Sequence, residues 1–422
     1  MRDGKPVFAF FAVSRTGNRG AVSMLESAID HLTATPADGW VHVFTVYPKQ
    51  DARLAKPRPR VDLRDGGPIR LVTWLIPMCI LWRLLRMLHL APPPRWWGGD
   101  MQALLESDVC VMAGGTTFTD AQKFKVIYNV ACAAPAILLG KRSMFYSQTM
   151  GPFNHPFNRF WAKWVLNRVD LVVPRGKGSY DHVKNLGISH AMELPDSAFT
   201  LVVPKEAEDA IRAEYRPLLE GRTVVGISVN TIVQGKCNAL GIDHNGVWVR
   251  FIGYLQERGY YVLLIPHSMR PGSKSLHNND LVPVHEIYDR LPSKENIHIV
   301  EKHYDCKELR VLVGLADYYV ASRFHSMISA LCTETPVSVI GWGYQKYREV
   351  LAEFDLESYC RDAAELSFEG LVEGFERIVR EADSIKARMR EHLPEVQARS
   401  RRNHEEALRL AELGRNASKR MT

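Results

Sequence analysis

Residues 317–331 read DYYVASRFHSMISAL, and this stretch decides what kind of fold the chain adopts. Its first part is apolar, as expected of a buried parallel strand, and its last part places small and apolar residues at helical spacing. Between the two parts stand Ser322, Arg323, Phe324 and His325. A strand that passes directly into a helix is half of a βαβ unit, so the stretch predicts a parallel α/β sheet.

The same strand-to-helix pattern recurs on both sides of this stretch. The apolar runs that we predict as strands are 7–13, 42–47, 107–113, 136–139, 143–147, 171–174, 223–229, 260–266, 297–300, 315–321 and 337–340. Alternation of strands with helical patterns indicates right-handed βαβ crossovers. A charged stretch follows residue 204, and then the cycle restarts. The sequence therefore predicts an α/β protein with two facing Rossmann-like domains, 1–204 and 219–380, closed by an amphipathic helix at 381–422.

Length and composition agree with two soluble domains. The chain has 422 residues, of which 46% are hydrophobic and 24% charged, so it is neither disordered nor limited to one core. The net charge of +7 favours an anionic small substrate or surface over nucleic acid. Seven scattered cysteines without a CxxC pair predict reduced thiols in a cytoplasmic protein, and no metal site. The N-terminal residues predict a first strand and not a signal peptide.

One segment, residues 70–97, departs from the α/β pattern. Residues 71–82 (LVTWLIPMCILW) are largely apolar, and arginines and tryptophans follow as far as residue 97. Twelve residues rise about 18 Å as a helix, short of the roughly 30 Å of a bilayer core, so we expect no membrane span. Two interpretations stay open: a peripheral contact on the inner face of the membrane, or a helical insertion buried against the N-terminal domain.

The turn at Ser322–His325 has the chemistry of an anion site. The first amides of a helix have no intrahelical partners, and the helix dipole adds partial positive charge there. Arg323 can bind a carboxylate or phosphate through two parallel hydrogen bonds, and His325 can move a proton near neutral pH. Such a pair suits a multiply charged substrate that must be protonated. The structural alternative is an arginine paired with a core carboxylate and a histidine that caps the helix.

Further candidates stand where other predicted strands end. Arg175 directly follows the strand 171–174, so its head group should reach the same cleft, although a solvated loop arginine is the alternative. The weaker candidates are Asn18 in GNRG (17–20), Gly115 in GGTT (114–117), His267 in IPHS (265–268) and Lys346 in WGYQK (342–346). Each of these four is either a substrate contact or an ordinary loop residue.

Taken in order, these pieces resemble the polysaccharide pyruvyl transferase family. The matching motifs are GNRGA (17–21), SQTMGPF (147–153), PRGKGS (174–179), LPDSAF (194–199), IPHS (265–268), DYYVASRFHSMISAL (317–331) and GWGYQKY (341–347). The resemblance implies a fold like that of the two-domain GT-B glycosyltransferases. It also implies a cell-envelope enzyme that uses phosphoenolpyruvate as co-substrate, with no bound cofactor. Such an enzyme places a pyruvyl group as a ketal across two hydroxyls of a sugar in a glycan or glycolipid and releases phosphate.

The resemblance also implies roles for individual residues. Arg175 and Arg323, with the backbone at Phe324 and His325, correspond to the family's phosphoenolpyruvate-binding positions. In the mechanism that we expect from these residues, His325 donates a proton to the methylene carbon, and Arg175 and Arg323 hold the donor's anions. The other candidate substrate contacts, which come from the residues themselves and not from the resemblance, are Ser322, His267, Lys346, Asn18 and Gly115, and His267 is also the candidate base. The C-terminal domain is then the donor side, and the N-terminal domain with its 70–97 insertion the acceptor side.

Two other functions compete with this interpretation. A nucleotide-sugar glycosyltransferase of the same architecture commonly carries a glutamate in an E-A-x3-G-x-P pattern. Counted back from Pro336, that position is Ser329, which cannot make the same bidentate contact with a ribose. A non-catalytic scaffold at the membrane surface would use the 70–97 segment but leave Arg175, Arg323 and His325 without a role.

Overall fold

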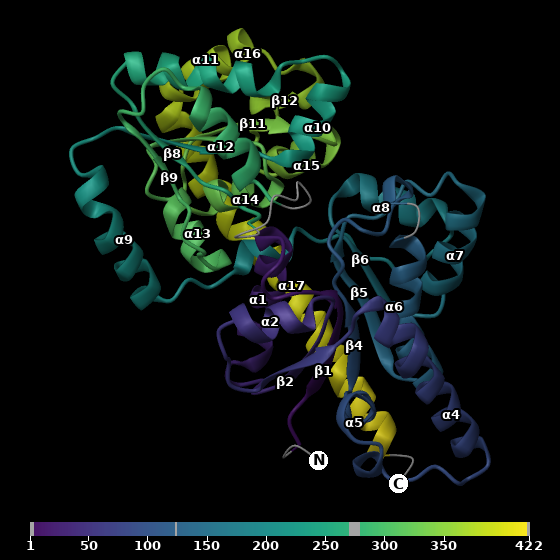
Figure 1. The fold of residues 1–422 in the computed structure, drawn as a ribbon. Helices are drawn as coiled ribbons and strands as arrows, with labels where there is room; N and C mark the ends of the chain where they lie inside the picture. The colour runs from purple at the N-terminus through teal and green to yellow at the C-terminus, as the bar shows by residue number, and fades with distance from the viewer. Residues whose placement is uncertain (1–3, 123–124, 270–278, 420–422) are drawn as a thin grey trace. The chain divides into compact units, whose positions relative to one another are not determined.

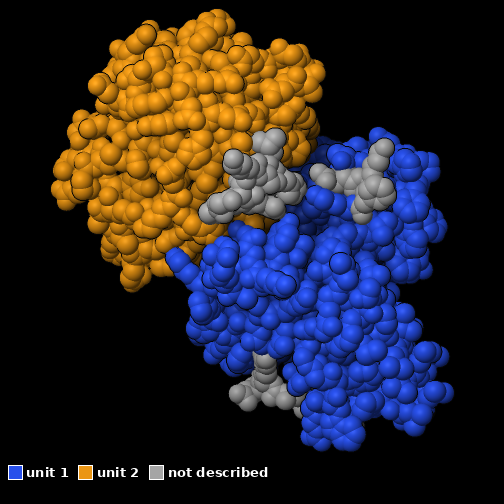
Figure 2. Space-filling model, in the orientation of Figure 1, with its two compact units in different colours: residues 1–16, 24–201, 398–422 blue, residues 17–23, 202–397 orange. Residues whose placement is uncertain are grey.

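The computed structural model describes residues 4–122, 125–269 and 279–419. Their backbone divides into two compact units, coloured blue and orange in Figure 2. Unit 1 comprises residues 1–16, 24–201 and 398–422, and unit 2 comprises residues 17–23 and 202–397. The short segment 17–23, which follows the first strand, thus belongs with the second unit. This assignment places the GNRG motif among the loops of unit 2.

Each unit is built on one parallel sheet (Figure 1). In the described part of unit 1 the six strands lie in the order β3-β2-β1-β4-β5-β6. Their bounds are β1 Val7–Val13, β2 Trp40–Thr45, β3 Val61–Asp65, β4 Val109–Met112, β5 Arg142–Gln148 and β6 Leu171–Pro174. The order is that of a doubly wound dinucleotide-binding fold, in which ligands bind where the strand order reverses. In unit 1 that point lies between β1 and β4.

The sheet of unit 2 has the same winding. Its six described strands lie in the order β12-β11-β10-β7-β8-β9, so β7 takes the place of β1 and β10 that of β4. Their bounds are β7 Val224–Ser228, β8 Tyr261–Leu264, β9 Ile297–Ile299, β10 Tyr318–Ala321, β11 Val337–Gly341 and β12 Cys360–Asp362. The order reverses between β7 and β10, whose last residues Ser228 and Ala321 are register partners. The two predicted Rossmann-like sheets are confirmed. The strand predicted at 136–139 was wrong, because this apolar run is the buried end of a helix, Lys125–Leu139.

Helices connect the strands of both sheets. In unit 1 they are α1 Arg19–Thr33, which begins in unit 2, α2 Pro48–Leu54, α3 Pro68–Arg70, η1 Leu71–Leu75, α4 Ile76–Met87, η2 Pro94–Trp96, α5 Gly99–Glu106, η3 Asp120–Gln122, α6 Lys125–Leu139, α7 Pro156–Leu166, α8 Lys177–Asn185 and η4 Ser197–Thr200. In unit 2 they are α9 Lys205–Leu219, α10 Thr231–Ala239, α11 His244–Glu257, α12 Leu281–Arg290, α13 Cys306–Val313, α14 Phe324–Cys332, α15 Tyr344–Ala352, η5 Glu357–Tyr359, η6 Ala363–Glu365 and α16 Phe368–Arg380. The last helix, α17 Ala382–Lys419, starts in unit 2 and ends in unit 1.

Apolar side chains on both faces of the unit 1 sheet explain why its strands are continuous apolar runs. Along β1, Phe8 and Phe10 point to the core shared with α1 and the end of α17, whereas Ala9 and Phe11 point to the core shared with α5 and α6. Alternate residues of a strand face opposite sides of its sheet, so burial of both faces requires an unbroken apolar sequence.

The 70–97 segment is longer as a helix than the sequence predicts. α3, η1 and α4 follow one another without a break from Pro68 to Met87, and this is the one helix of the described residues that is long and apolar enough to cross a membrane. It has 20 residues and a mean hydropathy of 1.5. The apolar stretch counted from the sequence stops at Trp82, whereas the helix continues through Arg83 and Arg86, which are good helix formers. The argument that its length excludes a span therefore does not hold.

Candidate functional site

In unit 1 three of the quoted motifs meet at Arg175. This arginine follows β6, and 5% of its surface is exposed. Its Nε donates to the hydroxyl of Thr149 at 2.9 Å, and its backbone amide donates to the carbonyl of Gln148 at 2.9 Å. Its guanidinium forms an ion pair with Asp196, which is buried. The motifs SQTMGPF, PRGKGS and LPDSAF are therefore parts of one cluster around a buried arginine.

The C-terminal helix holds the Asp196 loop in place. The hydroxyl of Ser400 donates to the carbonyl of Asp196 at 2.8 Å, and the amide of Asn403 donates to the carbonyl of Pro195 at 3.0 Å. One turn further on, the His404 ring contacts the hydroxyl of Thr200 at 2.8 Å, and burial lowers the pKa of this histidine well below its ordinary value. α17 thereby fixes the carboxylate that orients Arg175.

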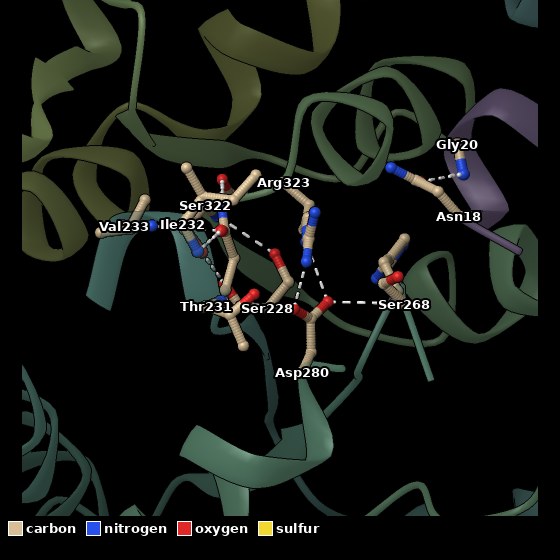
Figure 3. Close-up of polar contacts among 12 residues, drawn as sticks. Asn18, Gly20, Ser228, Thr231, Ile232, Val233, Ser268, Asp280, Ser322 and Arg323 are labelled. Carbon is tan, nitrogen blue, oxygen red and sulfur yellow. Dashed lines mark hydrogen bonds and ion pairs between the residues drawn. The ribbon is translucent and has the colours of Figure 1, made fainter. Parts of the chain in front are cut away.

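In unit 2 the quoted motifs meet at the point where the strand order reverses. Ser322, the residue after β10, is fully buried, and its backbone amide donates to the carbonyl of Ser228 at 3.1 Å. The Asn230 side chain caps α10 by accepting from the amides of Ile232 and Val233, and it donates to the Ser322 carbonyl at 2.6 Å. These bonds join the loops after β7 and β10 and fix the start of α14 (Figure 3).

Arg323 is not a solvated residue but half of a buried ion pair. Its Nε donates to one carboxylate oxygen of Asp280 at 2.9 Å, and its Nη2 donates to the other (Figure 3). The exposed fractions of the two side chains are 7% and 0%. The Asp280 carboxylate also accepts from the backbone amide of Ser268 at 3.0 Å. The structural alternative foreseen for Arg323, pairing with a core carboxylate, is thus realised, while the Nη1 edge of its guanidinium is not used by Asp280.

His267 lies in the same group of loops and keeps one ring nitrogen without a partner. Its Nδ1 lies 3.1 Å from the carbonyl oxygen of Ile265. Because a carbonyl oxygen only accepts hydrogen bonds, the ring proton is on Nδ1, and Nε2 carries a lone pair. Within the described residues the buried Nε2 has no hydrogen-bond partner. Burial lowers the pKa of His267 to about 4, and the positive charges of Arg323 and His325 add to this effect. The imidazole is therefore neutral at physiological pH and is an unprotonated base.

The GNRG motif packs against His325. A Cβ atom on Gly20 would lie 2.2 Å from Nδ1 and 2.6 Å from Cγ of the His325 ring, so only glycine leaves room for this imidazole. The side chain of Asn18 accepts from the Gly20 amide at 3.0 Å and holds the start of α1 (Figure 3). The backbone amide of Arg19 donates to the carbonyl of His267 at 3.3 Å. The motif after β1 thus supports both histidines of the candidate site.

Two further cations belong to the unit 2 cluster. Arg19 has 3% of its surface exposed, and its Nη2 lies 2.9 Å from Nδ1 of His303. Burial and the charge of Arg19 lower the pKa of His303. The Lys346 ammonium lies 3.6 Å from the ring centroid of Trp342 and 5.4 Å from that of Phe324. A cation held over aromatic faces keeps its charge in place beside the first turn of α14.

The predicted site residues therefore separate into two clusters, one in each unit. Unit 2 brings together Asn18, His267, Ser322, Arg323, Phe324, His325 and Lys346. Unit 1 holds Arg175, and Gly115 belongs to the same cluster because the amide of Thr149 donates to the Gly115 carbonyl at 2.9 Å. That Arg175 and Arg323 bind the same donor molecule stays a prediction.

Sequence reasoning missed three charged residues of these clusters. Asp196 stands in the quoted LPDSAF motif, and Arg19 stands in GNRG. A charged side chain inside each recognised motif was therefore the signal by which both residues could have been identified. Asp280 lies 43 residues before Arg323, in a stretch without any recognisable pattern. In residues 4–122, 125–269 and 279–419, no group of three or more His, Cys, Asp or Glu side chains is placed to hold a metal ion.

The contact between Gly20 and His325 yields a first test. Gly20→Ala is expected to displace the His325 ring and to lower turnover by about 10²-fold, the usual effect of misplacing a catalytic group by about 1 Å. Gly235→Ala in α10 is the matched control, because a Cβ there meets nothing within 4 Å. Steady-state kinetics and thermal melting of both variants check this, and unchanged turnover in Gly20→Ala would remove His325 from the chemistry.

Comparison with known proteins agrees with the motifs. The sequence matches the polysaccharide pyruvyl transferase family over residues 18–344. It is also similar to the amylovoran biosynthesis protein AmsJ of Erwinia amylovora, with 23% identity over 271 residues. The match spans 62% of this chain and 63% of that protein, which is less than two thirds of the relative's length.

Solved structures share the architecture. The UDP-GlcNAc 2-epimerase of Neisseria meningitidis aligns with a TM-score of 0.59 and 12% identity over 96% of this chain and 100% of its own. The UDP-GlcNAc 2-epimerase of Methanocaldococcus jannaschii aligns with a TM-score of 0.55 and 14% identity over 88% of this chain and 92% of its own. The trehalose 6-phosphate synthase of Burkholderia multivorans aligns with a TM-score of 0.56 and 10% identity over 98% of this chain and 99% of its own. At such identities the similarity shows the fold alone.

The fold comparison confirms the predicted GT-B type architecture of epimerases and glycosyltransferases. The family match begins in the loop after β1, ends at the first residue of α15 and covers well over half of the chain. The quoted motifs, from GNRGA to GWGYQKY, lie within the matched residues or at their ends. This chain therefore belongs to the polysaccharide pyruvyl transferase family.

Proposed function

We propose that this protein transfers a pyruvyl group from phosphoenolpyruvate to two hydroxyls of one sugar, forming a ketal and releasing phosphate. The observation that carries the proposal is the neutral His267, whose Nε2 lone pair is buried without a partner in the described residues near the charges of Arg323 and His325. A base and an acid beside fixed cations are what addition to an anionic enol ester requires.

Donor binding in this proposal rests on the cations of unit 2. Arg323 has five N–H donors in a rigid fork, and Asp280 occupies the edge formed by Nε and Nη2. The Nη1 edge is then available for a phosphate or carboxylate oxygen, with the guanidinium already oriented by Asp280. Arg19 and Lys346 add charge to the same cluster. Arg175 of unit 1 stays the predicted second contact to the donor.

Proton transfers in the proposal balance. His325 donates a proton to the methylene carbon, which becomes a methyl group, and C2 becomes electrophilic. The first sugar hydroxyl adds to C2 and gives its proton to Nε2 of His267. The C2–O bond to phosphate breaks, and the second hydroxyl adds at C2. Of the two protons released by the sugar hydroxyls, one restores the proton that His325 donated, and the other leaves with phosphate. The acceptor therefore gains the atoms of one pyruvic acid and loses those of one water.

A melting experiment separates this function from nucleotide-sugar glycosyl transfer. A ligand that binds only the folded protein raises the melting temperature, by an amount set by its concentration relative to Kd. Phosphoenolpyruvate is expected to raise it at millimolar concentration, and UDP-sugars are not. The GT-B fold alone does not discriminate, because the N. meningitidis structure named above is of an epimerase bound to UDP-GlcNAc. A shift with a UDP-sugar and none with phosphoenolpyruvate would favour the glycosyltransferase.

His267 gives a second test with a pH readout. His267→Asn is expected to lower turnover by about 10²-fold through loss of the base, with little change in donor affinity. The unfolded histidine titrates near 6.5 and the folded one at about 4, so between these pH values the unfolded state binds more protons and stability falls as the pH falls. The Asn variant should lose less stability than wild type over that window.

Urea denaturation between pH 7 and pH 4.5 measures the second effect. His89→Asn is the control, because His89 is exposed. Equal pH dependence in wild type and His267→Asn would show that His267 is not held neutral, and normal turnover in the variant would exclude it as the base.

A further inference from the structure

The outer face of the Pro68–Met87 helix, with the loop to Trp97, has no role in the proposed chemistry. We propose that this face, here called the docking face, binds the surface of an anionic phospholipid bilayer while the helix lies on the membrane and does not cross it. The inference does not depend on the reaction that the protein catalyses.

The inner face of the helix is committed to unit 1. Leu71, Leu75 and Cys79 recur every four residues and are fully buried in the core. The Sγ of Cys79 lies 3.9 Å from the Sδ of Met101 in α5. Figure 1 shows α4 running alongside α6, which it contacts. One stripe of the helix therefore packs on the protein along most of its length.

The docking face is the main exposed apolar surface among the described residues. Of the 17 large hydrophobic side chains that are exposed among all the described residues, nine fall between residues 69 and 96. They are Ile69, Val72, Ile80, Leu81, Leu84, Met87, Leu88, Leu90 and Trp96. Single exposed apolar residues are ordinary on soluble proteins, whereas a concentrated set marks a site of contact with another surface.

Charge identifies the partner as anionic lipid. Residues 66–99 contain four arginines, at positions 70, 83, 86 and 95, and no aspartate or glutamate. Arg70 forms an ion pair with Asp100 at 3.2 Å, and its guanidinium lies 3.9 Å from the Trp74 ring centroid. A second copy of this chain would bring the same arginines against each other, which disfavours self-association. Tryptophan and arginine beside an apolar face are instead the composition of an interfacial helix.

The two faces together also decide between lying on the membrane and crossing it. A helix of 20 residues rises about 30 Å, so its length alone would allow a span. To cross, however, the helix would have to leave unit 1 and expose the core around Met101 that Leu71, Leu75 and Cys79 now cover. An in-plane helix keeps this core intact and still removes the exposed side chains from water.

Flotation with vesicles tests the proposal on the full-length protein. At low salt the protein is expected to float with vesicles of phosphatidylcholine and phosphatidylglycerol, and much less with phosphatidylcholine alone. Leu84→Glu/Met87→Glu/Leu88→Glu should reduce flotation by at least about tenfold. Leu240→Glu, at a leucine that is 60% exposed on unit 2, is the matched control and should float like wild type. Arg83→Ala/Arg86→Ala should weaken binding to the anionic vesicles by about fivefold per arginine.

The alternatives give different results. Absence of flotation at low salt overturns the proposal, and so does equal flotation of the triple variant with an unchanged melting temperature. If the fraction of protein bound to the vesicles does not fall at high salt, the helix spans the bilayer, and the in-plane arrangement is contradicted. A soluble wild-type dimer that the triple variant converts to monomer, without flotation of either, assigns the face to a second copy of the chain.

Discussion

Arg323→Ala is expected to abolish pyruvyl transfer and also to destabilise the protein by about 3–5 kcal/mol, because it leaves the carboxylate of Asp280 buried without its charge partner. The first effect follows from the proposed donor site, in which the Nη1 edge of Arg323 binds an anion of phosphoenolpyruvate. The second follows from the bidentate pair with Asp280. From the sequence alone a well-folded Arg323→Ala protein would be expected, and the buried partner changes that expectation.

A double-mutant cycle separates the two effects. Arg323→Leu/Asp280→Leu removes both charges and should recover much of the stability, since apolar residues often replace buried ion pairs without loss. It should recover none of the donor binding. Arg250→Ala is the control, because its pair with Glu369 is exposed and should contribute less than about 1 kcal/mol. Normal binding of phosphoenolpyruvate by the folded double variant would assign Arg323 a structural role only.

His325→Ala is expected to lower turnover by roughly 10²–10⁴-fold, the range for loss of a general acid, while the affinity for phosphoenolpyruvate changes little. His325 is partly exposed at the first turn of α14, and its ring rests on Gly20, so its removal leaves Arg323 and Asp280 in place. Stopped-flow or steady-state measurement of kcat at saturating donor, with donor binding by calorimetry, gives both quantities.

The Gly20→Ala protein is the matched comparison for this substitution, since it keeps the imidazole and changes its position. Both variants should lose turnover, His325→Ala by more. A collapse of donor affinity with unchanged turnover at saturation would make His325 a binding residue and leave the proton to another group.

The sequence predicts the two sheets well because buried parallel strands are continuous apolar runs. The runs at Val7–Val13 and Tyr318–Ala321 show this clearly. Two edge strands escaped prediction. β3 reads VDLRD and β12 reads CRD, and both alternate or mix polar residues because an edge strand is only partly covered. Edge strands carry less of the hydrophobic signal on which the prediction relies.

The motifs of the candidate site were predictable from the sequence, but the ion pairs that its charged residues form were not. Strand ends of a doubly wound sheet gather at one edge, so Arg323, His325 and His267 could be grouped from their positions alone. The partner of Arg323 could not, because Asp280 is distant in sequence and stands in a loop without periodicity. The space requirement at Gly20 also depends on a contact with His325 that only the folded chain contains.

The length of the Pro68–Met87 helix exceeds the apolar stretch counted from the sequence for a related reason. A count of apolar residues stops at Arg83, whereas a helix continues through arginine without loss. The structure then shows what composition cannot, namely that Leu71, Leu75 and Cys79 face the core while Leu84 and Met87 do not.

The central claim is that phosphoenolpyruvate is the donor and a sugar diol the acceptor. The most direct test is incubation of the purified protein with phosphoenolpyruvate and a panel of soluble and lipid-linked glycans, followed by mass spectrometry and a phosphate assay. The account predicts a glycan product heavier by one pyruvic acid less one water, with one phosphate released for each ketal formed and none released without acceptor. Glycan products that gain a hexose from a UDP-sugar, with phosphoenolpyruvate left unconsumed, would contradict it.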